Sequence, residues 1–280
     1  MNLAETVALV TGGTRGVGKG IVLGLARVGA TVYFTGRTER EFEGAVRLPG
    51  SLSSTAAEAE GLDGRAIGIR CDHTVDADTQ GAVNRVLEEQ GRIDILVNNV
   101  WGGYEHYNDG TEFWKEHGFW TAPVSRWDKM FQAGVRAHFV TSHAVAPAMV
   151  ARGRGLVVNI SFWAAQRDDM GVAYGVAKAA TDQMTRTMAH ELRGHGVTVL
   201  SLYPGLVRTE SVVKAAEFFD LSNSESPEFI GLAIAALASD PEVQRKTGTI
   251  QIAAQVALDY GYTDIDGKQP RPLTVDDAKQ

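Results

Sequence analysis

Three residues near the middle of the chain have the types and the spacing that proton transfer requires. Tyr174 and Lys178 are four residues apart in a run of small residues typical of a helix, so their side chains share one face. A neighbouring ammonium favours the phenolate and lowers a tyrosine pKa from its usual value of about 10, which suits acid-base catalysis. Ser161, thirteen positions before Tyr174, adds a hydroxyl donor after an apolar run. A surface i,i+4 pair is the alternative for Tyr174 and Lys178.

The elements that would position these residues alternate between strands and helices. Apolar runs predict strands at 6–10, 31–35, 66–70, 93–97, 156–160, 197–202 and 249–253. Helical spacing of apolar residues predicts helices at 54–60, 76–90, 125–151, 172–193 and 227–239. This alternation, with no separating linker, indicates one α/β domain with a doubly wound parallel sheet.

Composition excludes several classes of protein. The 280 residues are 44% hydrophobic and 22% charged, as in ordinary globular proteins, and the net charge of −7 argues against binding to nucleic acid. Cys71 is the only cysteine, so no intrachain disulfide can form, and the seven histidines lack the spacing of metal ligands. No apolar run approaches about 18 residues and no signal peptide is visible. We therefore expect a cytoplasmic protein without a membrane span or a metal.

A glycine-rich loop lies between the first predicted strand and the first helix. Gly12, Gly16 and Gly18 follow the apolar run 6–10 at once and precede a helical pattern that starts at Ile21. Strand, glycine turn and helix are the context of a phosphate-binding loop, because the backbone can approach a pyrophosphate whose charge meets the positive end of the helix. A simple tight turn is the alternative.

Together these motifs resemble the classical short-chain dehydrogenase/reductase family. That family has a glycine loop of this spacing, an Asn after the fourth strand, a Ser thirteen positions before Tyr-x-x-x-Lys, and a Pro-Gly turn. This chain has all of them in that order over about residues 6–253. Four further features resemble one member of the family in particular, namely Gly134-x-Arg136, the motif from Tyr174 to Lys178, His190-Glu191-Leu192-Arg193 and the late Asp264-x-Asp266-Gly267.

The resemblance implies a fold and a division of the chain. It implies a single Rossmann domain over residues 1–280, with a core of about 6–253. It also implies substrate loops at 101–127 and 205–226, the second a mobile lid, and a C-terminal extension at 254–280. Because the tail from Leu258 onward is polar, we expect it to lie on the surface.

The same resemblance implies the roles of individual residues. Ser161, Tyr174 and Lys178 would be catalytic. The cofactor would be held by Gly12, Thr14, Arg15, Gly16, Val17, Gly18, Arg37, Asp72, Asn98, Tyr174, Lys178, Pro204, Gly205, Val207 and Thr209. Asn98 would also tie neighbouring strands together, and Thr209 would contact the carboxamide of the cofactor.

The cofactor is expected to be NADP(H). An NAD site carries an Asp or Glu about 20 residues after the glycine loop, where this chain has Gly36 and Arg37. Arg37 and Arg15 could bracket a 2′-phosphate, and two solvated surface arginines are the alternative. Asp72 either lies against the adenine ring, as the resemblance implies, or caps the helix that follows.

Two positions depart from the family pattern. Trp101 stands where the family has Gly, and we expect it to reshape the wall beside the nicotinamide. Gly134 stands where the family has an Asn that relays protons. A buried water needs about two to four polar partners, so we expect a water to occupy the volume of the missing side chain and to carry the relay.

Large apolar side chains gather in one loop. Eight aromatic residues, including four of the five tryptophans, lie between Trp101 and Trp127. We expect them to line or cover a pocket for an apolar substrate, and a subunit contact is the alternative. The resemblance implies a homodimer or homotetramer built on the helices at 125–151 and 172–193.

The sequence therefore favours an NADPH-dependent enzyme that reduces bulky apolar or aromatic ketones reversibly to alcohols. Tyr174 would donate the proton, Ser161 would hold the developing alkoxide, and Lys178 would support Tyr174 and hold the cofactor ribose. A cofactor-binding protein with weak turnover is the main rival, because of Gly134 and Trp101. A serine hydrolase is a second rival, but Ser161 lacks the Gly-x-Ser-x-Gly elbow.

Overall fold

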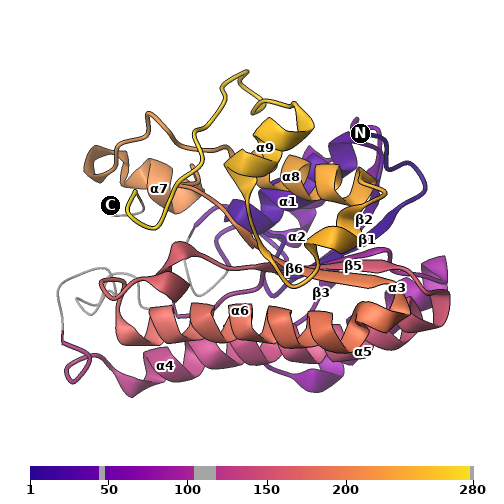
Figure 1. Ribbon diagram of the computed structural model, residues 1–280, viewed down its shortest axis with the longest axis horizontal. Helices are drawn as coiled ribbons and strands as arrows, with labels where there is room; N and C mark the ends of the chain where they lie inside the picture. Colours follow the sequence, from indigo (N-terminus) through magenta and orange to yellow (C-terminus); the bar gives the residue numbers. More distant parts are fainter. Residues whose placement is uncertain (44–47, 104–117, 278–280) are drawn as a thin grey trace.

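A single parallel sheet organises the chain. The computed structural model describes residues 1–43, 48–103 and 118–277, and its strands follow the order β3-β2-β1-β4-β5-β6-β7, all parallel (Figure 1). The strands are β1 (Val7–Val10), β2 (Thr31–Gly36), β3 (Arg65–Arg70), β4 (Ile95–Asn98), β5 (Gly155–Ile160), β6 (Val197–Tyr203) and β7 (Ile250–Ile252). The predicted doubly wound parallel sheet is confirmed.

Helices cover both faces of this sheet (Figure 1). One face packs against α1 (Gly16–Arg27), α2 (Leu52–Glu58), α8 (Pro227–Ser239) and α9 (Ala253–Tyr260). The other face packs against α3 (Asp76–Gln90), α5 (Ala137–Arg152) and α6 (Val172–Leu192). Strands β1, β4, β5 and β6 are buried throughout, which explains why they read as continuous apolar runs.

Helices α1 and α8 approach so closely that glycine is needed between them. A Cβ added to Gly20 would lie 2.0 Å from the carbonyl carbon of Pro227, and one added to Gly24 would lie 2.7 Å from the carbonyl oxygen of Glu228. Pro227 is the first residue of α8, immediately after the predicted lid segment at 205–226. Helix α1 therefore anchors the end of that segment.

Two predicted elements need correction. The helix expected at 125–151 is three pieces, α4 (Val124–Met130), a π-helical turn (Phe131–Arg136) and α5, because the backbone widens by one residue at the turn. The tail from Leu258 onward is not confined to the surface, since Asp264 and Leu273 are 3% and 8% exposed. The helices predicted at 76–90 and 227–239 are confirmed with those bounds.

The chain turns in opposite directions at β1 and β4, which are neighbours in the sheet. Ligands of open α/β sheets bind beyond the carboxyl ends of the strands at such a switch point. Over the described ranges 1–43, 48–103 and 118–277, no helix is long and apolar enough to cross a membrane. The same ranges contain no group of three or more His, Cys, Asp or Glu residues that could hold a metal.

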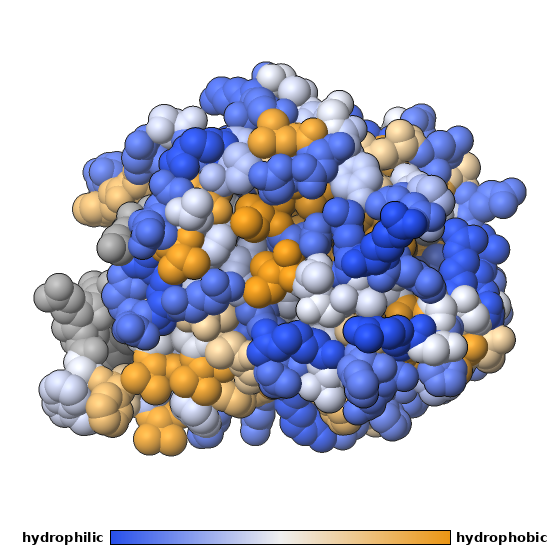
Figure 2. Space-filling view, viewed as in Figure 1, coloured by the Kyte–Doolittle hydropathy of each residue, from blue (hydrophilic) through white to orange (hydrophobic). Residues whose placement is uncertain are grey.

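Apolar side chains also gather on part of the surface. Figure 2 shows a cluster of them over α4, where Val124 and Trp127 are 75% and 39% exposed. Trp127 stacks on Phe131, with ring centroids 4.3 Å apart. On the outer sides of α5 and α6, Phe139 and Val172 are about half exposed. These side chains lie on the helices for which the family resemblance implies a subunit contact.

Candidate active site

The three predicted catalytic residues meet beyond the carboxyl end of β5. Ser161 follows β5 directly, whereas Tyr174 and Lys178 lie one turn apart in the first half of α6. The Ser161 hydroxyl donates to the Lys178 carbonyl oxygen at 3.4 Å, and the Lys178 ammonium donates to the Ile160 carbonyl oxygen at 3.3 Å. All three side chains are buried. The alternative of an exposed Tyr174–Lys178 pair is therefore wrong.

Burial dominates the electrostatics of Lys178. Loss of hydration lowers the pKa of its ammonium from 10.5 to about 8, and the carboxylate of Asp182, one turn further along α6, opposes that shift. The pKa of His138 falls to about 3, mainly through burial and also through the charge of Lys178. Lys178 is therefore charged at neutral pH beside a neutral imidazole.

Asp182 is a site residue that the sequence reading missed. Its carboxylate accepts hydrogen bonds from the hydroxyls of Ser201 and Tyr203, both on β6. Burial, followed by the contact with Asp182, raises the pKa of Tyr203 well above its usual range. The i,i+4 spacing of Lys178 and Asp182 was the available signal, since it places both on one face of the helix.

Asn98 ties strands together, as predicted. Its side-chain amide donates to the Asn159 side chain of β5 at 2.8 Å and to the Ser142 hydroxyl of α5 at 2.9 Å. The Asn98 side-chain oxygen is buried and accepts no hydrogen bond in the described part of the chain. Asn98 therefore fixes the ends of β4 and β5 beside the catalytic residues.

The glycine loop has the close backbone packing of a phosphate-binding loop. Gly12 has a φ of +71°, and a Cβ added to it would lie 2.9 Å from the Val100 Cα. A Cβ added to Gly18 would lie 2.0 Å from the Gly12 carbonyl oxygen. Val17 packs against the core, so the amides at the start of α1 are held in place. This cradle fits the diphosphate of a dinucleotide.

Arg15 and Arg37 lie close together at the end of β2. The charge of Arg37 contributes, after burial, to lowering the pKa of Arg15. The Arg15 guanidinium donates to the Gly50 carbonyl oxygen at 2.8 Å, while its buried Nε has no partner among the described residues. Arg37 lies 3.9 Å from the Asp72 carboxylate. Two guanidinium groups at this point can bind an anionic group, and the 2′-phosphate of NADP stays the predicted one.

Asp72 does not cap the following helix, so that alternative is wrong. Helix α3 begins after Val75, which provides no side-chain cap. The Asp72 carboxylate instead accepts from the backbone amide and the hydroxyl of Thr74, at 3.0 and 2.8 Å. Its role beside an adenine ring stays a prediction.

The segment after β6 is held by a buried carboxyl group that the sequence reading also missed. The Gly205 amide donates to the Glu225 carboxylate at 2.8 Å, and Val207 forms a parallel bridge with Glu225. Burial raises the pKa of Glu225 to about 8. Thr209 caps the short helix α7 (Glu210–Lys214) by accepting from the Val212 amide. Pro204 joins this segment to β6, and the cofactor roles of all these residues stay predictions.

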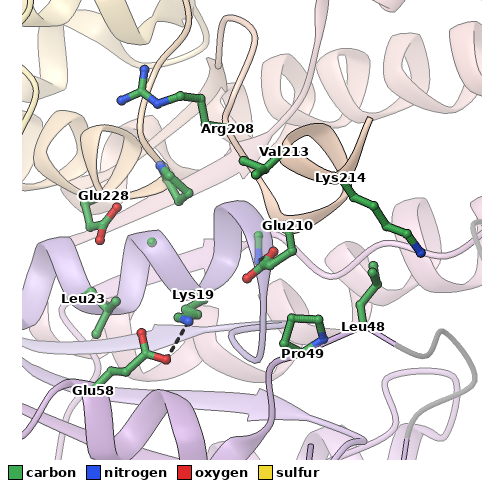
Figure 3. A pocket seen from close by; sticks show the side chains of 13 residues that line it. Lys19, Leu23, Leu48, Pro49, Glu58, Arg208, Glu210, Val213, Lys214 and Glu228 are labelled. Atoms are coloured by element: carbon green, nitrogen blue, oxygen red, sulfur yellow. Dashed lines mark hydrogen bonds and ion pairs between the residues drawn. The ribbon is translucent and has the colours of Figure 1, made fainter. Parts of the chain in front are cut away.

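Glu210 reaches from α7 to the glycine loop. The Gly16 amide, at the start of α1, donates to the Glu210 carboxylate at 2.9 Å. A pocket of about 590 Å³ opens beside this contact between α1, α7 and the start of α8 (Figure 3). Lys19 and Lys214 also line the pocket, and Lys19 pairs with Glu58. The amide end of α1 therefore faces an anionic side chain.

The water expected at Gly134 is excluded by a side chain. A Cβ added to Gly134 would lie only 2.5 Å from Cζ3 of the Trp101 indole, so this ring fills the volume of the missing Asn. The indole also covers Lys178, whose Nζ is 4.0 Å from the ring centroid. The two departures from the family pattern are thus in contact with each other.

The aromatic loop is only partly described, because residues 104–117 lie outside the described residues. Trp101 lies in the site, but Phe119 and Trp120 are 69% and 77% exposed. These two rings pack against each other edge to face. The role of the loop as the wall of a substrate pocket stays a prediction.

Comparison with known proteins agrees with this geometry. A family model described as short chain dehydrogenase matches residues 6–218. "Dehydrogenase/reductase SDR family member 1" from Mus musculus is 38% identical over 94% of this chain and 84% of its own length, and the Homo sapiens protein is 36% identical.

Solved structures share the fold. A 7α-hydroxysteroid dehydrogenase complexed with NADH and 7-oxo glycochenodeoxycholic acid is 25% identical, with a TM-score of 0.73 over 90% of this chain and 93% of its own. A metagenomic short-chain oxidoreductase in complex with NADP is 27% identical, with a TM-score of 0.68 over 89% of this chain and 96% of its own.

The buried ammonium predicts that Lys178→Met raises the free energy of unfolding. A pKa lowered by burial from 10.5 to about 8 corresponds to roughly 3 kcal/mol at 1.36 kcal/mol per pKa unit, so we expect a gain of about 1–3 kcal/mol at pH 7. The pKa of Lys178 is lower in the folded chain than in the unfolded chain, so between about pH 8 and 10.5 the unfolded chain binds more protons. The original chain therefore becomes more stable as the pH rises through this range. The gain should therefore shrink as the pH rises from about 8 to 10.5.

Urea unfolding at pH 7 and pH 10 measures this effect. The exposed residue Lys214 provides the control, since Lys214→Met should change stability little at either pH. A Lys178→Met variant less stable than the original at pH 7, or a gain that does not change with pH, would contradict the expectation.

Proposed function

The chain belongs to the short chain dehydrogenase family, and on that premise we propose that it is an NADP(H)-dependent oxidoreductase that reversibly reduces a carbonyl group to an alcohol. The observation that carries the proposal is the cluster of Ser161, Tyr174 and Lys178, with a buried ammonium one turn from the phenol. The single buried cysteine, Cys71, supports a reducing cytoplasmic location.

Each of the three predicted catalytic residues would have its own role in the reduction of the carbonyl group. Bound NADPH would supply the hydride. Tyr174 would donate a proton to the carbonyl oxygen of the substrate, and the Ser161 hydroxyl would donate a hydrogen bond to the same oxygen as negative charge develops. Lys178 would stabilise the phenolate that remains, and burial would exclude water that weakens this interaction.

The described groups fit NADP(H) in three places. Gly12, Gly16 and Gly18 would form the cradle for the diphosphate, which their close backbone packing supports. Arg15 and Arg37 would hold the 2′-phosphate, and Lys178 would reach the ribose. Solved relatives contain NADH in one case and NADP in another, so this choice rests on the two arginines of this chain.

Bulky apolar or aromatic ketones are the proposed substrates. Trp101, Phe162 and Met130 surround the Tyr174 ring with apolar surface, and one solved relative is complexed with a 7-oxo bile acid. NADPH oxidation with aryl, steroid-like and small hydrophilic carbonyl compounds tests the proposal. Saturable NADPH binding without oxidation by any of them would favour the rival, a cofactor-binding protein with weak turnover.

Tyr174→Phe should lower kcat by at least about 10²-fold, because the proton donor is lost. NADPH affinity, measured by fluorescence titration, should change little. Tyr33→Phe is the matched control, since Tyr33 lies on β2 and its hydroxyl donates to Glu89 away from the site. Turnover in the Tyr174→Phe variant equal to that of the control would rule out Tyr174 as the acid.

Arg37→Ala should weaken NADPH binding by roughly 10- to 100-fold, since one charge-assisted contact to the 2′-phosphate is lost. NADH binding should change far less. Arg40→Ala, an exposed arginine three positions away, is the control and should affect neither cofactor. An equal loss for NADPH and NADH in the Arg37→Ala variant would show that Arg37 does not contact the phosphate.

A homodimer or homotetramer is the proposed assembly, through the outer sides of α5 and α6. Phe139, Val172 and Val176 expose apolar side chains there, at 53%, 50% and 42%. Phe139→Glu should lower the sedimentation coefficient, to that of a monomer from a dimer or to that of a smaller species from a tetramer, whereas Leu258→Glu, on the helix α9 of the opposite face, should not. A monomeric original chain, or an unchanged sedimentation coefficient in the Phe139→Glu variant, would contradict this interface.

A further inference from the structure

The side chains at positions 101 and 134 are sterically matched. The Trp101 indole lies so close to the Gly134 Cα that an added Cβ would meet ring carbons at 2.5 and 2.7 Å. These contacts are shorter than any real Cβ makes, so a side chain at Gly134 cannot coexist with the ring in this position. Gly134 is buried in the π-helical turn 131–136, which leaves it little freedom to move away.

The same indole contacts both members of the Tyr–Lys pair. The Lys178 Nζ lies 4.0 Å from the centroid of the indole, a distance typical of a cation–π contact. The Tyr174 ring packs against Trp101 edge to face, with centroids 5.5 Å apart and planes at 83°. One side chain therefore limits the movement of the ammonium and of the phenol.

Lys178 needs stabilisation from its surroundings, because it has lost its hydration. The charged and titratable groups that face it are Asp182 and Tyr174 on its own helix and His138 on α5. His138 donates through Nε2 to the Val100 carbonyl oxygen and is neutral, so it adds no charge. Asp182 is shared with the hydroxyls of Ser201 and Tyr203. The Ile160 carbonyl oxygen accepts one hydrogen bond from the ammonium, at 3.3 Å, and the negative face of the Trp101 ring is a further stabilising surface.

We propose that Trp101 is a positioning residue, which holds the Lys178 ammonium charged and directed at Tyr174 in the space that Gly134 leaves. The proposal rests on the oxidoreductase function proposed above and adds a residue to that site. In this arrangement the ring, and not an amide or a water at position 134, supports the lysine. Trp101 acts through Lys178 and transfers no proton itself.

The ionisation of Tyr174 reports on this arrangement. If the ring is lost, the ammonium is less stabilised and deprotonates at lower pH, so the phenolate forms at higher pH. Trp101→Leu should move the midpoint of phenolate formation up by about one pH unit, whereas Trp101→Phe, which keeps an aromatic face, should move it less. The pH profile of alcohol oxidation should move by the same amount.

Phenolate absorbance, measured as the difference between each protein and its Tyr174→Phe counterpart, gives the midpoint without any turnover. The Trp101 proposal can therefore be tested even if the protein reduces no carbonyl compound. If the original chain turns over carbonyl compounds but the Tyr174 midpoint is unshifted in the Trp101 variants, only the role of Trp101 is overturned and the proposed function is kept. Equal midpoints in the Trp101→Leu variant, the Trp101→Phe variant and the original chain would overturn the proposal.

The steric match has a test of its own. Gly134→Asn alone should lower the melting temperature, because the new side chain clashes with the indole. The double variant Trp101→Gly, Gly134→Asn should recover most of that loss and bring the Tyr174 midpoint closer to the original than Trp101→Gly alone does. An additive loss of stability in the double variant would contradict the coupling of the two positions.

Discussion

The ammonium of Lys178 is enclosed by protein, and much of the structure around it compensates for the lost hydration. Asp182 supplies charge from the same helix, Ile160 supplies a carbonyl oxygen, and Trp101 supplies the face of an indole. The parallel sheet makes this possible, because it brings the ends of β4, β5 and β6 to one edge. Without burial the lysine would act weakly on Tyr174, and without compensation it would lose its proton.

The sequence predicted most strands and helices correctly, because their patterns lie within short stretches of the chain. Buried parallel strands read as continuous apolar runs, and α3 shows helical spacing over its full length, so both could be recognised without tertiary information. The three predicted catalytic residues, Ser161, Tyr174 and Lys178, could be named because they are close in sequence and their spacing matches that of the family. The structure then showed that Ser161 and Lys178 are in contact.

The contacts that could not be predicted join residues far apart in the chain. Nothing in the sequence shows that Trp101 and Gly134 touch, because the contact depends on the widened turn between α4 and α5. Glu225 was missed for a similar reason, since a carboxylate between two serines, with a Pro two positions later, normally indicates a surface loop. Only the packing of the segment after β6 buries it against Gly205.

The bond between the Gly16 amide and Glu210 has a consequence for the order of events at the site. A phosphate that bound to the Gly16 amide would have to displace the Glu210 carboxylate. Its net affinity would therefore be the difference between the amide–phosphate and the amide–carboxylate interactions. Glu210 belongs to α7, so loss of this contact would separate α7 from α1. Under the proposed function, binding of the dinucleotide would release α7, which lies in the predicted lid segment. The coenzyme would then be expected to bind before the carbonyl substrate and to leave after the alcohol.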